Sequence, residues 1–126
     1  AEAIFFAGGD QYTYLTDWNG TKLQTAVQNA IDNRNVPIGG TSAGCDIQGY
    51  YIYSAANGST TSVEADVNPY NAQMTFANFF ITQKYDILHN VIIDTHFVTR
   101  KRFGRLLAFI ARLETDIPSK KGMIKG

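Results

Sequence analysis

The sequence predicts an α/β fold with a doubly wound, mostly parallel sheet. Three observations support this class. Short apolar runs typical of buried parallel strands alternate with longer segments in which apolar residues recur at helical spacing. The resulting order of strand, helix, strand and helix is that of a βαβ unit. The chain has 126 residues, 44% of them hydrophobic, which suits one globular domain or a piece of one.

The first strand is predicted over residues 3–7, where AIFFA is continuously apolar and is closed by Gly8-Gly9-Asp10. An amphipathic helix is predicted over residues 21–34, with Thr21 or Asn19 as its N-cap. Its apolar face consists of Leu23, Ala26, Val27, Ala30 and Ile31.

A second short strand is predicted over residues 36–38. The small residues 39–44 that follow lead into a helix predicted over residues 45–51. Residues 54–72 are rich in Ser, Thr, Asn and Gly, so we expect a surface excursion there, one that could cover a site.

In the last third of the chain, the aromatic cluster at residues 76–81 predicts a short helix with core contacts. The next strand is predicted over residues 90–94, with Thr95-His96-Phe97 at its carboxyl end. An amphipathic helix with a basic first half is predicted over residues 100–113. Its apolar face consists of Phe103, Leu106, Leu107, Ile110 and Leu113.

The two ends of the chain indicate a partial domain. The sequence begins at Ala1 inside a strand-like run and stops at Gly126 without a closing element. We therefore expect residues 1–126 to form a single partial domain whose sheet is incomplete at the termini. Exposed apolar strand edges would then favour association, for example as a homodimer.

The charge balance argues against partners that bind through bulk electrostatics. Eleven basic and eleven acidic residues give a formal net charge of zero, so we expect neither nucleic acid nor a membrane as a partner. The single cysteine, Cys45, excludes an intrachain disulfide. Asn19-Gly20-Thr21 and Asn57-Gly58-Ser59 match the N-glycosylation pattern. A secreted location would follow if they are used; otherwise a cytoplasmic one is favoured.

The carboxyl ends of the predicted strands are where chemistry is expected, because the loops of an open α/β sheet converge there. Gly40-x-Ser42-x-Gly44 fits the strand–turn–helix elbow that exposes a nucleophilic serine. His96 lies at a neighbouring strand end, where it could take the serine proton. Two ordinary interpretations stay open: Ser42 as a capping residue in a glycine-rich turn, and His96 as a hydrogen-bonded histidine at a strand end.

Three blocks of the sequence, IFFAGGDQ, GGTSAGC and DTHFVTRKRFGRLL, resemble in this order the signature blocks of the cyanophycinase and aspartyl dipeptidase family of serine peptidases. VNPYN also resembles the family pattern, and the match spans nearly the whole chain. The resemblance implies the fold of the class I glutamine amidotransferases, a flavodoxin-like three-layer sandwich. No cofactor is expected.

The resemblance also implies catalytic roles. Ser42 would attack the carbonyl carbon of the scissile amide, and His96 would take the proton and later return it to the leaving amine. The backbone N–H groups of Gly9 and Ala43 would form the oxyanion hole. The implied function is a serine-type exopeptidase that hydrolyses aspartyl-linked peptides, including β-aspartyl–arginine units.

An acidic peptide substrate needs a cationic clamp. By resemblance, the substrate-binding residues are Gln11, Arg100 and Arg102, with Arg105 as an additional member. Taken alone, the run RKRFGR would indicate a solvated basic helix face instead.

The sequence departs from the family pattern in two places, with Thr95 where the family has Gln and Cys45 where Ala is common. The acid that completes the triad is expected beyond Gly126, and we assign that role to neither Glu114 nor Asp116. Without it, some catalysis can persist from the oxyanion hole.

Rival assignments remain. Cys45 as a nucleophile is disfavoured, because it lies three positions past the elbow centre and is expected to be a small helix residue. A metal site built from Asp94, His96 and His89 is disfavoured, because no further ligand cluster accompanies them. The alternative functions are a non-catalytic binding homologue that lacks the triad acid and an esterase-like serine hydrolase.

Overall fold

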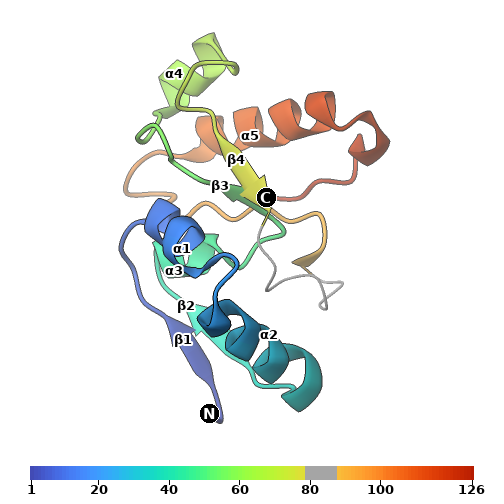
Figure 1. Ribbon diagram of the computed structural model, residues 1–126. Coiled ribbons are helices and arrows are strands. Elements are labelled where there is room, and N and C mark those ends of the chain that lie inside the picture. The colour runs from blue at the N-terminus through green and yellow to red at the C-terminus, as the bar shows by residue number, and fades with distance from the viewer. Residues whose placement is uncertain (79–87) are drawn as a thin grey trace.

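The computed structural model describes residues 1–78 and 88–126, and it has a mixed α/β architecture with a parallel pair of strands (Figure 1). The elements in chain order are β1 (Ile4–Phe6), α1 (Gln11–Trp18), α2 (Lys22–Arg34), β2 (Ile38–Gly40), α3 (Ala43–Asp46), β3 (Tyr51–Tyr53), α4 (Ser62–Val67), β4 (Phe76–Asn78), α5 (Phe103–Asp116) and the 3-10 turn η3 (Pro118–Lys120). Among the described residues, no helix is long and apolar enough to span a membrane.

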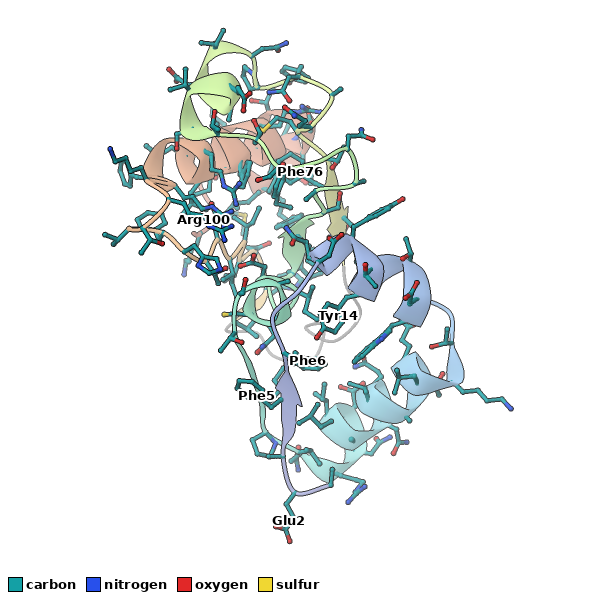
Figure 2. The ribbon with its side chains drawn as sticks, turned by 90° about the vertical axis from the view of Figure 1, so that its left-hand side faces the viewer. Glu2, Phe5, Phe6, Tyr14, Phe76 and Arg100 are labelled. Carbon is teal, nitrogen blue, oxygen red and sulfur yellow. The ribbon has the colours of Figure 1, made fainter. Side chains whose placement is uncertain are left out.

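The first core lies between the parallel strands β1 and β2 and the helices α1 and α2. Phe6 pairs with Gly40 across the strands, and its buried ring packs against Tyr14 at 6.4 Å between ring centroids. Because strand side chains alternate between faces, Phe5 projects to the opposite side of β1 and is exposed, as Figure 2 shows. One face of this strand pair is therefore covered by helices.

The second core is built on the antiparallel strands β3 and β4 and on α5, in the other half of the molecule (Figure 1). The ring of Phe109 in α5 stacks on that of Tyr53, with 4.5 Å between ring centroids, and meets the ring of Phe76 edge-on, with 5.4 Å between centroids. A parallel bridge between Tyr51 and Ile92 brings the segment before His96 beside β3. The catalytic candidates thus lie where the two halves meet, around α3.

Several predicted elements are confirmed. The helix predicted over residues 21–34 is α2, and the side chain of Thr21 caps it by accepting from Gln24 N. The strand predicted over residues 3–7 is β1. The polar excursion is present, but it also contains α4, whose start is fixed by a capping box between Thr61 and Glu64.

Other predictions are wrong. The helix expected over residues 45–51 ends at Asp46, and the strand β3 follows because its three residues are all buried and pair with β4. The short helix expected from Phe76 is a strand over β4, and its remaining residues 79–81 lie outside the described residues. The second strand lies at β2, slightly later than residues 36–38, and α1 was not predicted. The segment predicted as a strand over residues 90–94 forms no strand; Val91 and Ile92 make isolated bridges to Lys125 and Tyr51.

The last helix is present as α5, and the face it buries agrees with the predicted one in part. Leu113 is buried as predicted, and Leu106 and Ile110 pack against the second core. Phe103 and Leu107 are instead 63% and 52% exposed, and Arg105 and Phe109, which the prediction left out, are buried. The helix turns Arg105 inward because that side chain pairs with the buried carboxylate of Asp94. Periodicity of apolar residues alone could not detect a cation on the buried face.

Candidate active site

Ser42 sits at a sharp turn between β2 and α3, and its backbone is left-handed with φ 50° and ψ −126°. The two flanking glycines are required by close approach. A Cβ on Gly44 would lie 2.2 Å from the carbonyl oxygen of Phe6, and one on Gly40 would lie 2.3 Å from the carbonyl oxygen of Gly44. Ser42 makes no capping hydrogen bond with its side chain. These features are those of a nucleophile elbow and argue against a capping serine.

His96 faces this elbow. Its Nε2 lies 2.8 Å from Ser42 Oγ, although the two residues are 54 positions apart in the sequence. With the imidazole proton on Nδ1, the serine hydroxyl donates to Nε2, which is the arrangement that a general base needs. The backbone of His96 is also left-handed, with φ 54°. The predicted pair is therefore within hydrogen-bond reach.

A polar pocket of about 270 Å³ opens over this pair. Its walls come from all three predicted strand-end loops and from the polar excursion after β3, so the loops do face one crevice. The lining residues are Gly9, Asp10, Gln11, Ser42, Asp46, Ala55, Gly58, Ser59, His96, Arg100 and Arg102. A more apolar hollow between α4 and α5 lies apart from the Ser42–His96 pair and shares none of these residues.

The loop between β1 and α1 lies against the elbow. A Cβ on Gly8 would come within 3.2 Å of Ser42 Cβ, and Gly9 lines the pocket. Among the described residues, the N–H groups of Gly9 and Ala43 donate to no protein acceptor. Both groups are therefore free to donate to a bound oxygen, as an oxyanion hole requires.

The expected substrate-binding residues fall into two groups. Gln11 begins α1, lines the pocket and donates to the carbonyl oxygen of Tyr53 at 3.2 Å. Arg100 lies on the loop that leads into α5 and also lines the pocket (Figure 2). Its guanidinium makes no ion pair with any described residue, so it is available to an anion.

Arg102 and Arg105 are instead engaged by the protein itself. Arg105 is 2% exposed, and it holds Asp94 with two bonds, Nε to Oδ2 at 2.7 Å and Nη2 to Oδ1 at 2.6 Å. It also donates to Ser59 Oγ and to the carbonyl oxygen of Thr60, but it does not line the pocket. Arg102 lines the pocket, and burial lowers the pKa of its guanidinium. The structure therefore brings Arg100 and Arg102 to the pocket but not Arg105.

Sequence reasoning missed Asp46. This carboxyl is 6% exposed, lines the pocket, and accepts a hydrogen bond from the backbone N–H of Thr95 at 3.0 Å. Burial raises its pKa to about 6. An acidic residue one helical turn after the candidate nucleophile was the signal available in the sequence.

The metal interpretation gains no support. His89 packs on the ring of Tyr50 at 4.7 Å between ring centroids. Asp94 is occupied by the two arginines. Among the residues that the structure describes, no three histidine, cysteine or acidic side chains gather as a metal site.

Cys45 is expected to react slowly with alkylating reagents. Burial, followed by the nearby charge of Asp46, raises the pKa of its thiol, so less of the reactive thiolate is present. Alkylation by iodoacetamide at about pH 8 should be several-fold slower in the folded protein than in urea. Equal rates in both conditions would contradict the raised pKa and would reopen the assignment of Cys45 as a nucleophile.

Comparison with known proteins adds to the geometry. Residues 1–112 match the sequence model of the family described as "Peptidase family S51". The chain is 28% identical over 109 residues to a cyanophycinase of Geminocystis herdmanii, a match that covers 86% of this chain and 36% of that protein. It is 23% identical over 108 residues to cyanophycinases of Trichormus variabilis and of a Nostoc species, which covers 86% of this chain and 32% of each relative. The chain thus spans about a third of the length of these relatives.

Proposed function

The chain belongs to peptidase family S51, and from this premise we propose that it carries the nucleophile and the general base of a serine-type exopeptidase that acts on aspartyl-linked peptides. The observation that carries the proposal is the 2.8 Å contact between Ser42 Oγ and His96 Nε2 at a strained elbow. A binding homologue would have no need of either the strain or the contact.

The proposed reaction begins when Ser42 Oγ attacks the carbonyl carbon of the scissile amide while His96 Nε2 takes its proton. The oxyanion that forms is held by the N–H groups of Gly9 and Ala43. His96 then gives the proton to the leaving amine nitrogen, the C–N bond breaks, and an acyl ester remains on Ser42. Water, activated by His96, hydrolyses that ester and releases the acid.

The proposed substrate class rests on the pocket and on the named relatives. The pocket of about 270 Å³ is slightly smaller than the usual ligand cleft of about 300–1,000 Å³, which suits a dipeptide-sized unit. Arg100 supplies an unpaired cation for an aspartyl carboxylate. The relatives named above are cyanophycinases, which favours β-aspartyl–arginine units as the substrate.

The acid that would orient His96 is not found in the described part of the chain. No described carboxylate bonds His96 Nδ1, and Glu114 and Asp116 lie at the far end of α5, where Glu114 accepts from Ile124 N and Asp116 pairs with Arg112. Because the chain spans about a third of its relatives, we propose that a later segment of the whole protein supplies this acid.

The test is hydrolysis of β-aspartyl–arginine and α-aspartyl dipeptides by this chain, by a version extended at its C-terminus, and by Ser42→Ala in each. We expect the extended protein to cleave at least one substrate and Ser42→Ala to remove the cleavage. A folded, extended protein that binds these dipeptides without cleaving them would establish the binding homologue instead. Cleavage of simple esters but not of the dipeptides would establish the esterase.

Substitution of Arg100 by glutamine is expected to weaken substrate binding. A charge-assisted hydrogen bond contributes about 1.5–3 kcal/mol, so KM for an aspartyl substrate should rise roughly 10- to 100-fold, with a smaller change in kcat. The matched control is Arg34→Gln, which removes an exposed arginine at the end of α2. An unchanged KM for Arg100→Gln would remove Arg100 from the proposed clamp.

A further inference from the structure

The backbone of Thr95, the residue before the general base, is held from two directions. Its N–H donates to Asp46 Oδ1 at 3.0 Å, and its carbonyl oxygen accepts from Arg102 Nη1 at 2.7 Å. These two groups belong to the peptide units on either side of Thr95, so the orientation of both units is fixed. The next residue, His96, has a left-handed backbone with φ 54°.

We propose that Asp46 is a positioning residue, which together with Arg102 clamps the backbone of Thr95 and thereby sets the imidazole of His96 against Ser42. The inference rests on the proposed peptidase function and deepens it. A left-handed backbone is unfavourable for a residue other than glycine. Without these two hydrogen bonds, the backbone of His96 would relax toward a more favourable conformation and move the imidazole. A displacement of about 1 Å in a catalytic group can lower the rate roughly 100-fold.

The clamp is tied to the nucleophile itself. Asp46 lies one turn after Ser42 in α3, and its N–H donates to the carbonyl oxygen of Ser42 at 2.9 Å. Contacts therefore run from Ser42 along the helix to Asp46, across to Thr95, along the chain to His96, and back to Ser42 Oγ at 2.8 Å. In this closed ring the helix that carries the nucleophile also sets the place of the base.

The charge of Asp46 supports a functional role. Burial raises its pKa from 3.8 to about 6, with the hydrogen bond from the Thr95 N–H opposing that shift, Asp94 adding to it and Arg102 opposing it. A folded-state pKa above the ordinary value means that the ionised carboxylate destabilises the fold, fully above about pH 6 and not at all below pH 3.8. The chain keeps a carboxylate here at a cost in stability, as functional sites often do.

The test compares two substitutions in the whole protein. Asp46→Ala removes the acceptor for Thr95 N–H, whereas Asp46→Asn keeps an acceptor oxygen without the charge. We expect Asp46→Ala to lower kcat roughly 100-fold with KM changed by less than about 2-fold, and Asp46→Asn to lose no more than about 10-fold. The matched control is Asp66→Asn, which removes an exposed carboxylate on α4. Unchanged kcat in Asp46→Ala would overturn the proposal.

A second measurement separates the clamp from the peptidase function. The amide proton of Thr95, followed by NMR, should shift with a midpoint near pH 6 in the wild-type protein as Asp46 loses its proton. The titratable and charged groups nearby are Asp94, Arg102, Cys45 and, within the pocket, Asp10, His96 and Arg100. Because the His96 imidazole is adjacent to Thr95, the comparison is made in proteins that also carry His96→Gln, where the shift should disappear on Asp46→Asn if it reports this carboxyl.

A failure of the proposed function can be told apart from a failure of the positioning role of Asp46. If Ser42 is never phosphonylated by a phosphonate probe in the whole wild-type protein, the proposed function is wrong. The Thr95 titration would still decide whether Asp46 holds the loop. A titration that persists in Asp46→Asn in the His96→Gln background would overturn the role of Asp46, even if the whole protein with its native His96 is active and even if Asp46→Ala does not fold.

Discussion

Ser42→Ala should reduce the hydrolysis of aspartyl substrates by about 10⁴- to 10⁶-fold in kcat, the range seen when a triad serine is removed. The methyl side chain of the variant would have no nucleophilic oxygen, so no acyl ester could form. Any residual rate would come from the free N–H groups of Gly9 and Ala43 and from substrate binding. The measurement is steady-state kinetics of the whole protein, together with labelling of Ser42 by a phosphonate probe.

The control for this substitution is Ser119→Ala, which removes an exposed hydroxyl after α5. Both variants should unfold at the same urea concentration as the wild-type protein. If Ser42→Ala keeps more than about one per cent of kcat, another group performs the attack. Cys45→Ala would then show whether the neighbouring thiol does so.

The elbow at Ser42 could be predicted from the sequence because its determinants are local. The spacing of Gly40, Ser42 and Gly44 encodes the elbow, since a side chain at either glycine would collide with backbone atoms. The three strand-end loops could be placed together because topology brings carboxyl ends to one edge. Ser42 and His96 are 54 positions apart, and the isolated bridge between Tyr51 and Ile92, not a full strand, brings the segment before His96 beside β3.

The remaining features depend on tertiary contacts that periodicity does not report. The helix predicted over residues 45–51 fails because Tyr51, Ile52 and Tyr53 gain more from strand pairing and full burial than from helix formation. Asp46 was overlooked because its partner, the backbone N–H of Thr95, lies 49 residues away. Every residue except proline carries a backbone N–H, so residue identity does not indicate which one a buried carboxylate will bind.

The basic run before and within α5 shows the same limit. By resemblance, its arginines were expected to bind substrate, and the alternative was a solvated face. In the structure, Arg105 does not lie on a solvated face, because its guanidinium is buried against Asp94 and lies 5.1 Å from the ring centroid of Tyr53. It also anchors Ser59, which forms part of the pocket wall. Arg105 therefore shapes the pocket from behind.

Arg105→Met is expected to lower the free energy of unfolding by about 3–5 kcal/mol, the usual result of removing one partner of a buried ion pair. Among the described residues, the carboxylate of Asp94 would keep only the 3.3 Å contact with Arg102, and Ser59 and Thr60 would lose this donor. The measurement is urea unfolding followed by circular dichroism. The matched control is Arg112→Met in the same helix. Its partner, Asp116, is 39% exposed, so the ion pair contributes about 1 kcal/mol or less. The hydrogen bond to the carbonyl oxygen of Pro69 and the Tyr70 ring each add about 1 kcal/mol, so the expected loss stays below that of Arg105→Met.

The kinetics of the same variants separate a structural role from a substrate contact. A direct contact would raise KM in Arg105→Met while leaving stability near that of the wild-type protein. Arg105→Lys keeps the charge but cannot reproduce the two-bond fork on Asp94, so it should also lose stability if the role is structural. Wild-type stability in both variants, combined with a raised KM, would return Arg105 to the residues that bind the substrate carboxylate. Loss of stability in both would leave Arg100 as the free cation that meets the substrate carboxylate.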